Sequence, residues 1–282
     1  MRHAIVALPI LLVLMLMGCG SIAPAANLNT ASEELSGKLA ITGSSTIAPV
    51  ILEIAKRFEK KHPGVRVDVQ TGGSSRGVAD TQKGLAQIGL ASRALKAEEQ
   101  IELKAFPLAV DGVCVILHKD NPISELSSEQ IIAIYTGKLL RWNEAGGLDR
   151  PITVVNKAEG RSTLELFSAH FKLQPRDIKA SVVIGDNEHG IKTVAGNPDA
   201  IGYVSIGSAE YAASNGIAVK LLGISSVPAS IENVRNGKFP LSRPLNLVTK
   251  GEPTGLTKAF IDFCRAREHH DIIQEQYFVP IE

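Results

Sequence analysis

Residues 38–91 read KLAITGSSTIAPVILEIAKRFEKKHPGVRVDVQTGGSSRGVADTQKGLAQIGLA, and this stretch carries the strongest evidence for the fold class. Residues 38–42 predict a short strand, and the apolar spacing from Ile47 to Phe58 predicts a helix that ends before Pro63. The alternation of apolar and polar residues in 65–70 predicts a second strand. A strand, a helix and a strand in this order indicate α/β layers around largely parallel sheets.

The same alternation continues along the chain. A glycine-rich loop follows the second strand, and Ser127 with Gln130 forms a capping box that predicts the start of a helix. The further strands that we expect are 87–91, 110–117, 152–155, 201–204, 218–222 and 245–248, and the further helices are 78–83, 98–105, 131–135, 163–171 and 257–267.

Length and composition exclude several classes of protein. The chain has 282 residues, enough for two modest domains or one large one. Because its formal net charge is only +1, it lacks the basic excess with which nucleic-acid-binding proteins neutralise phosphates. With 44% hydrophobic and 21% charged residues it can bury a sizeable core, which excludes a disordered chain.

The first residues predict export. Residues 4–17 contain no charge and follow a short positive start, but they are too few to span a membrane, so residues 1–18 are predicted to be a signal peptide. Leu16 to Cys19 resembles a bacterial lipobox, which predicts a lipidated Cys19, and residues 19–37 would form a flexible tether. We therefore expect a lipid-anchored protein outside the cytoplasmic membrane of a bacterium.

Three loops share one pattern, in which a strand ends, a run of Gly, Ser and Thr follows, and a helix begins. They are residues 43–46, 72–77 and 157–163. Glycines let backbone amides turn toward one point, hydroxyls donate hydrogen bonds, and the positive end of the following helix dipole favours an anion. Two of the loops also carry Arg or Lys, which helix capping does not require. We expect the loops to bind one small oxyanion together, since no single loop has enough donors.

An alternative interpretation is a serine hydrolase, because Gly73, Ser75 and Gly77 fit the nucleophile-elbow pattern between a strand and a helix. Against it, only about one strand and one helix fit before this elbow, and no acid and histidine downstream lie in a recognisable setting. The seven histidines lack metal-ligand spacing, so we expect no metal site. The sequence motifs that bind the phosphates of nucleotides are also missing, so we expect no nucleotide cofactor. We therefore expect no cofactor of any kind and no catalysis. Cys114 and Cys264 lie in apolar stretches and are predicted to be buried free thiols.

At these loops the chain resembles the Pst-type phosphate-binding proteins, the extracytoplasmic receptors of ABC phosphate importers with the type II periplasmic binding-protein fold. The resemblance spans roughly residues 38–280 in consistent order. Besides the loops, the residues that carry it are Ile88, Gly89, Ala91, Ser92, Arg93, Asp111, Gly112, Asn121, Pro122, Gly137, Trp142, Phe167, Ala200, Ile201, Gly202 and Tyr203.

The resemblance implies two α/β lobes joined by two crossing strands, each lobe a mostly parallel sheet flanked by helices, with the ligand in the cleft between them. Lobe one would comprise residues 38–111 and 246–282, and lobe two residues 112–245. It also implies a monomer that captures inorganic phosphate by hinge closure and delivers it to the permease of an ABC importer. The implied ligand-binding residues are Ser45, Thr46, Ile47 through its amide, Ser74, Ser75, Arg93, Lys157, Arg161, Ser162 and Thr163.

The chain departs from the family pattern at two places. Some relatives have an aspartate after the third strand that accepts a proton of phosphate and so excludes sulfate, whereas here Ser92 is followed by Arg93. The third loop has Lys157 and then Gly160 to Thr163, where relatives have Arg and Gly-Ser-Gly-Thr. Extra positive charge favours oxyanions in general, so sulfate is the alternative ligand of the same class. A sensor without transport is an alternative of another class.

Overall fold

The computed structural model describes Met1 and residues 35–281. The predicted signal peptide, the lipidation site at Cys19 and most of the predicted tether lie outside the described residues. No helix that the structure describes combines the length and the apolar character needed to span a bilayer.

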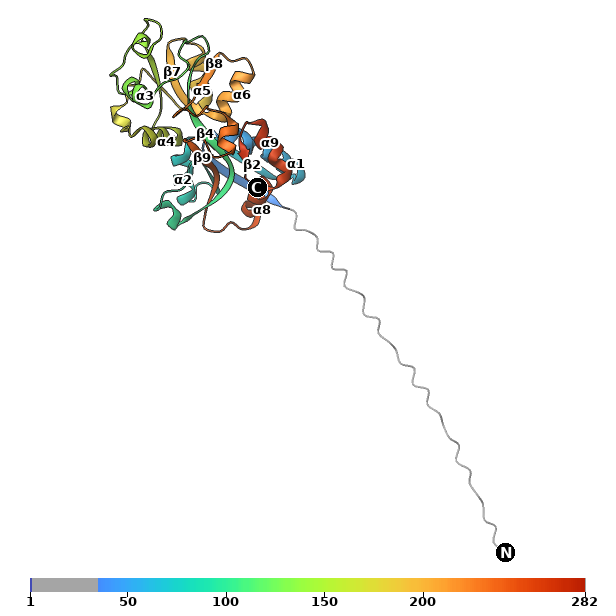
Figure 1. Ribbon diagram of the computed structural model, residues 1–282. Coiled ribbons are helices and arrows are strands. Elements are labelled where there is room, and N and C mark those ends of the chain that lie inside the picture. The colour runs from blue at the N-terminus through green and yellow to red at the C-terminus, as the bar shows by residue number, and fades with distance from the viewer. Residues whose placement is uncertain (2–34, 282) are drawn as a thin grey trace. The chain divides into compact units, whose positions relative to one another are not determined.

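One hydrophobic core forms around the N-terminal strands and the C-terminal helices, and we call it the first core. Its strand β1 pairs in parallel with β2 and with β3. Leu39 and Ile41 of β1 and Ile51 of α1 are fully buried there with Phe260. The elements on this side are β1 (Ser36–Gly43), α1 (Ala48–Lys61), β2 (Gly64–Thr71), α2 (Ser74–Gln82), β3 (Ile88–Ala91), α8 (Gly255–Arg265), α9 (His270–Glu275) and β10 (Val279–Pro280) (Figure 1).

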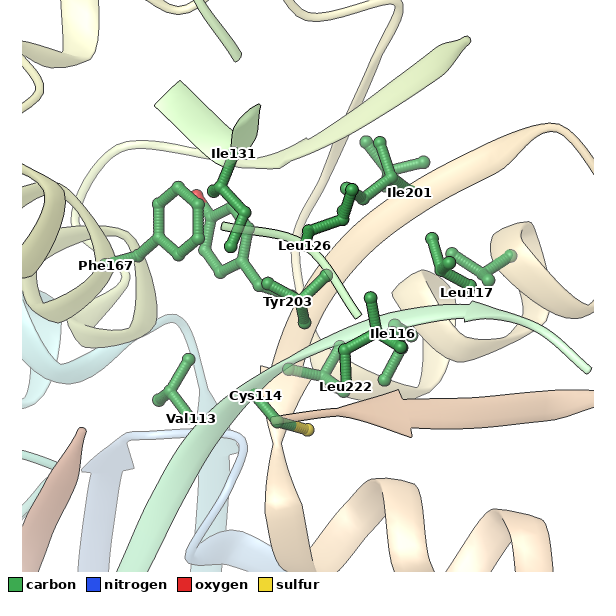
Figure 2. Close-up of a cluster of buried hydrophobic side chains, with 14 of the residues drawn as sticks. Val113, Cys114, Ile116, Leu117, Leu126, Ile131, Phe167, Ile201, Tyr203 and Leu222 are labelled. Carbon is green, nitrogen blue, oxygen red and sulfur yellow. The ribbon is translucent and has the colours of Figure 1, made fainter. Parts of the chain in front are cut away.

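The middle of the chain forms a second core. Strand β5 pairs in parallel with β6 and with β7, and the rings of Phe167 and Tyr203 stack with centroids 3.9 Å apart among the buried residues of Figure 2. The elements on this side are α3 (Ser128–Tyr135), β5 (Thr153–Lys157), α4 (Ser162–Phe171), β6 (Val182–Ile184), α5 (Asn187–Ala195), β7 (Ala200–Ser205), α6 (Ile206–Ser214), β8 (Val219–Leu222) and α7 (Ile231–Arg235).

Two long strands connect the cores. Strands β4 (Leu103–His118) and β9 (Ser242–Lys250) are antiparallel, and their pairing runs from Leu103 with Lys250 to Gly112 with Ser242. The strand order is β2-β1-β3-β9-β4-β7-β5-β6, so the sheet is parallel toward both ends and antiparallel in the middle. The three loops of the predicted anion site follow the carboxyl ends of β1, β2 and β5.

Most predicted elements are confirmed, including the capping box in which Ser127 and Gln130 bond each other's backbone. The helix predicted over 98–105 is wrong, because the structure has one short turn at Glu99–Ile101 and β4 begins at Leu103. Residues 103–105 pair with residues 248–250 of β9, and this pairing overrides the local pattern. The structure adds β6, α5, α6, α7, α9 and β10, which the sequence analysis did not predict. Cys114 and Cys264 are buried and free, as predicted.

Candidate functional site

The first of the three loops is fixed by tight backbone packing at the end of β1. Gly43 has φ +135°, and a Cβ there would lie 2.4 Å from the carbonyl oxygen of Leu90, so only glycine fits. The Ser44 hydroxyl accepts a hydrogen bond from the amide of Thr46 at 3.1 Å and is also bonded to the Ser92 hydroxyl. The chain therefore turns sharply after β1 and presents Thr46 just before α1.

The second loop enters α2 through Gly73, which has φ +98°. The Ser74 hydroxyl, buried at the first turn of α2, accepts the amide of Ser92 at 3.0 Å and donates to the Ser162 hydroxyl at 3.0 Å. A Cβ on Gly73 would lie 2.6 Å from the carbonyl oxygen of Gly160, which belongs to the third loop. The second and third loops are thus in direct contact, although they extend from different cores.

The third loop carries two cations between β5 and α4. Lys157, the last residue of β5, is buried, and its Nζ donates to Oδ1 of Asn187 at 3.1 Å. Arg161 precedes the first turn of α4, where Ser162 and Thr163 are buried. Because Ser162 and Thr163 start the helix, their hydroxyls lie at the positive end of its dipole.

These loops converge on one small pocket. About 10 Å³ inside it is open to the centre of a water-sized sphere, which suits a small ligand. Asn187, at the start of α5, donates from Nδ2 to the Thr46 hydroxyl at 3.1 Å and so links the two sides. The lining residues are Ser44, Ser45, Thr46, Gly73, Ser74, Lys157, Arg161, Ser162, Thr163, Gly185 and Asn187. Among these described residues there is no carboxylate and no histidine, so the pocket favours an anion that accepts hydrogen bonds.

The electrostatic environment of Lys157 is unusual for a lysine. Burial, together with the nearby positive charges of Arg243 and Arg161, lowers the pKa of Lys157 to about 7, while Asp186 opposes this shift. A lysine of this kind gains a proton readily when a negative charge arrives beside it. Its environment therefore matches an anion site.

Seven of the ten residues predicted to bind the ligand line the pocket: Ser45, Thr46, Ser74, Lys157, Arg161, Ser162 and Thr163. Ile47 is buried next to the start of α1 and is not among the lining residues. Ser75 and Arg93 also lie outside the lining.

Arg93 and Ser75 bind a carboxylate instead of lining the pocket. Arg93 forms an ion pair with Glu99 at 2.7 Å and lies 2.9 Å from Glu165 of α4. The Ser75 hydroxyl donates to Glu165 at 2.9 Å. The sequence could not reveal Glu165 as a partner of Arg93 and Ser75, because Glu165 belongs to α4 of the other core. Ser75 and Arg93 thus contact α4 across the boundary between the cores, in an arrangement that we call the Glu165 contact.

Two parts of the site were missed in the sequence. The first is a fourth loop of the same kind, in which β6 ends, Gly185 follows and α5 begins at Asn187. The short β6 concealed it. Behind the pocket, Arg243 of β9 and Asp111 of β4 form a buried ion pair at 2.8 Å. Its partners are 132 residues apart in the chain, so no local pattern indicates it.

The geometry does not support the serine hydrolase. Ser75 donates to the Glu165 carboxylate, whereas a nucleophile of this class donates to an imidazole that takes its proton. Within residues 35–281 there is also no group of three or more His, Cys, Asp or Glu side chains placed to hold a metal ion.

The chain is similar to known proteins over most of its length. Residues 28–268 match the model of the PBP superfamily domain. The phosphate-binding protein PstS of Bacillus subtilis is 30% identical over 253 residues, which cover 88% of this chain and 82% of that protein.

Solved structures give the same result. One is a protein from Clostridium perfringens, assigned as a phosphate ABC transporter substrate-binding protein and solved with bound phosphate. It is 34% identical to this chain with a TM-score of 0.80, and the match covers 87% of this chain and 100% of that one. An ABC-type phosphate transport receptor from Vibrio cholerae has a TM-score of 0.71 at 29% identity, with 86% of this chain and 99% of its own chain covered.

Proposed function

This chain belongs to the PstS phosphate-binding proteins of the PBP superfamily, and from that premise we propose that its pocket captures inorganic phosphate for delivery to an ABC import permease. It is a transport receptor and not an enzyme. The observation that carries the proposal is the convergence of hydroxyls and two cations from both cores on one pocket whose lining residues include no carboxylate.

We assign phosphate binding to the side chains that line the pocket and can donate. Several charge-assisted hydrogen bonds, each contributing about 1.5–3 kcal/mol, can together outweigh the cost of removing water from the anion. Thr46 would donate from the side of the first core, with Ser45 and the Ile47 amide beside it, while the Ser74 hydroxyl donates to Ser162 and holds that donor in place. The donors from the second core are Lys157, Arg161, Ser162 and Thr163. Asn187 positions two of the donors instead, because its Nδ2 donates to the Thr46 and Ser208 hydroxyls and its Oδ1 accepts from Lys157.

The two cores would act as lobes that close on the anion. Lobe one would comprise residues 38–111 and 246–282, lobe two would comprise residues 112–245, and β4 and β9 would form the hinge. An anion bound to donors of both lobes stabilises the closed arrangement, since only there can all donors reach it. The Glu165 contact adds a bond between the lobes that does not involve the ligand.

We also propose that the protein is exported and anchored to the membrane by lipid on Cys19 after removal of residues 1–18. Such an anchor would keep the receptor near its permease at the outer face of the cytoplasmic membrane or in the periplasm. Metabolic labelling of the expressing bacterium with a fatty-acid probe tests this, because Cys19→Ser should lose the label.

Titration of ligand-stripped protein with phosphate, arsenate, sulfate and molybdate by calorimetry tests the proposed function. We expect one site per chain, with phosphate and arsenate bound most tightly. Sulfate bound more tightly than phosphate would make this a receptor for another oxyanion. No binding of any of the four would overturn the proposal.

The affinity for phosphate is expected to fall as pH rises above about 7. Lys157, with a pKa of about 7 in this structure, loses its proton in that range, whereas a bound anion raises its pKa and restores the proton. Binding above pH 7 therefore takes up a proton, and the Lys157 contribution weakens the affinity by up to about tenfold per pH unit.

Phosphate itself titrates in this range, so the comparison needs a matched variant. Lys157→Arg keeps its charge at every pH used, while the titration of the ligand is the same for both proteins. Calorimetry near pH 8.5 in buffers of different ionisation enthalpy counts the protons taken up. We expect nearly one proton more for the wild type than for Lys157→Arg, and equal counts would contradict the assignment.

A further inference from the structure

The ion pair behind the pocket lies where the two connecting strands meet. Asp111 of β4 and Arg243 of β9 are direct partners in the antiparallel register. Their side chains are fully buried, at 0% and 1% exposed. Oδ2 of Asp111 accepts from Nε of Arg243 at 3.1 Å and from Nη2 at 2.8 Å.

Asp111 is fixed from the other side as well. Its Oδ1 accepts from the Ser205 hydroxyl at 2.9 Å and from the amide of Gly207 at 3.4 Å. Ser205 ends β7 and Gly207 lies in the first turn of α6. The carboxylate therefore holds the guanidinium of Arg243 in one orientation.

The remaining donors of Arg243 reach hydroxyls of the pocket from both cores. Nη1 donates to Thr163 at 3.1 Å and to Ser162 at 3.3 Å, and Nη2 donates to Thr46 at 3.4 Å. Arg243 itself is not among the residues that line the pocket. It can therefore act on a ligand through these hydroxyls.

The hydrogen bonds of two hydroxyls fix the direction of their protons. A hydroxyl has two acceptor positions and one proton. Thr46 accepts from Arg243 and from Asn187, and Ser162 accepts from Arg243 and from Ser74. Both acceptor positions of each oxygen are filled, so each hydroxyl can only donate.

We propose that Arg243, held by Asp111, is a positioning residue that makes Thr46 and Ser162 pure hydrogen-bond donors toward the pocket and so selects ligand oxygens that accept. This inference rests on the proposed function and adds a specificity-determining pair to it. It also explains why a buried ion pair, which seldom adds stability by itself, lies beside the site.

Arg243→Lys is the direct test, because lysine keeps the charge and can pair with Asp111 but cannot bond three hydroxyls and the carboxylate at once. We expect calorimetry to show phosphate bound at least about tenfold more weakly, with a melting temperature close to that of the wild type. Unchanged affinity would overturn the inference and leave the proposed function intact. Wild-type protein that binds no oxyanion would overturn both.

A double-mutant cycle separates positioning from a general structural role. If Arg243 acts through the Thr46 hydroxyl, Thr46→Val should cost much less affinity in the Arg243→Lys background than in the wild type. Fully additive losses would overturn the inference. Should Arg243→Lys fail to fold, the neutral pair Asp111→Asn with Arg243→Gln replaces it, with the same expected weakening and the same contrary result.

Discussion

Gly73→Ala is expected to weaken phosphate binding by at least about 100-fold while both lobes stay folded. The new Cβ would lie 2.6 Å from the carbonyl oxygen of Gly160, a contact that real Cβ atoms do not make. Since Gly73 and Gly160 belong to different sides of the pocket, the clash separates the loops instead of disrupting either core. The donors of the two sides then cannot reach the same anion.

Gly84→Ala is the matched control for this prediction. Gly84 also has a positive φ, +71°, but a Cβ there meets nothing within 4 Å. Both variants introduce backbone strain on the order of 1–3 kcal/mol, so both should lower the melting temperature, Gly73→Ala more because φ +98° with ψ 160° is a region that essentially only glycine adopts. Only Gly73→Ala should lose affinity in calorimetry. Equal affinities of the two variants would show that the loops need not approach so closely.

Arg161→Ala should reduce the affinity for phosphate by about 100-fold or more, with little change in thermal stability. Unlike Arg93, Arg161 has no carboxylate partner in the part of the chain that the structure describes. Its guanidinium can therefore donate two charge-assisted hydrogen bonds to one anion, and losing them costs at least about 3 kcal/mol.

Arg176→Ala serves as the control, because Arg176 is exposed and does not line the pocket, so the substitution removes the same charge without removing a lining residue. Calorimetry with phosphate should leave its affinity close to that of the wild type. A similar loss in both variants would indicate that net charge, and not contact with the anion, accounts for the effect.

The fold could be predicted largely from local patterns. Strands such as 65–69 alternate cleanly, and α1 has a continuous apolar face that ends at a proline. The errors arose where long-range pairing decides the structure. The local pattern of residues 103–105 predicts the end of a helix, but in the structure these residues pair with β9 as a strand. Strand β6 has only three residues, too few to show a periodicity in the sequence.

The part of the candidate site that could be predicted from the sequence is the part built by loops between a strand and a helix. Gly, Ser and Thr between a strand and a helix are visible in sequence, and the seven lining residues come from such loops. The sequence does not show which carboxylate, if any, pairs with a given arginine or lysine. Arg93 and Arg161 both follow a strand and could both bind an anion, but in the structure Arg93 forms ion pairs with Glu99 and Glu165. Arg243 could not be singled out at all, because its role depends on its pairing with Asp111 across two strands.

The two buried cysteines have a practical consequence. Burial raises the pKa of both the Cys114 and the Cys264 thiol, so neither forms the thiolate that reacts with maleimides or oxidants. A dye attached to an engineered surface cysteine on each lobe would therefore meet no competing native thiol within residues 35–281. Energy transfer between two such dyes could therefore test the proposed closure in single molecules while Cys114 and Cys264 stay in place.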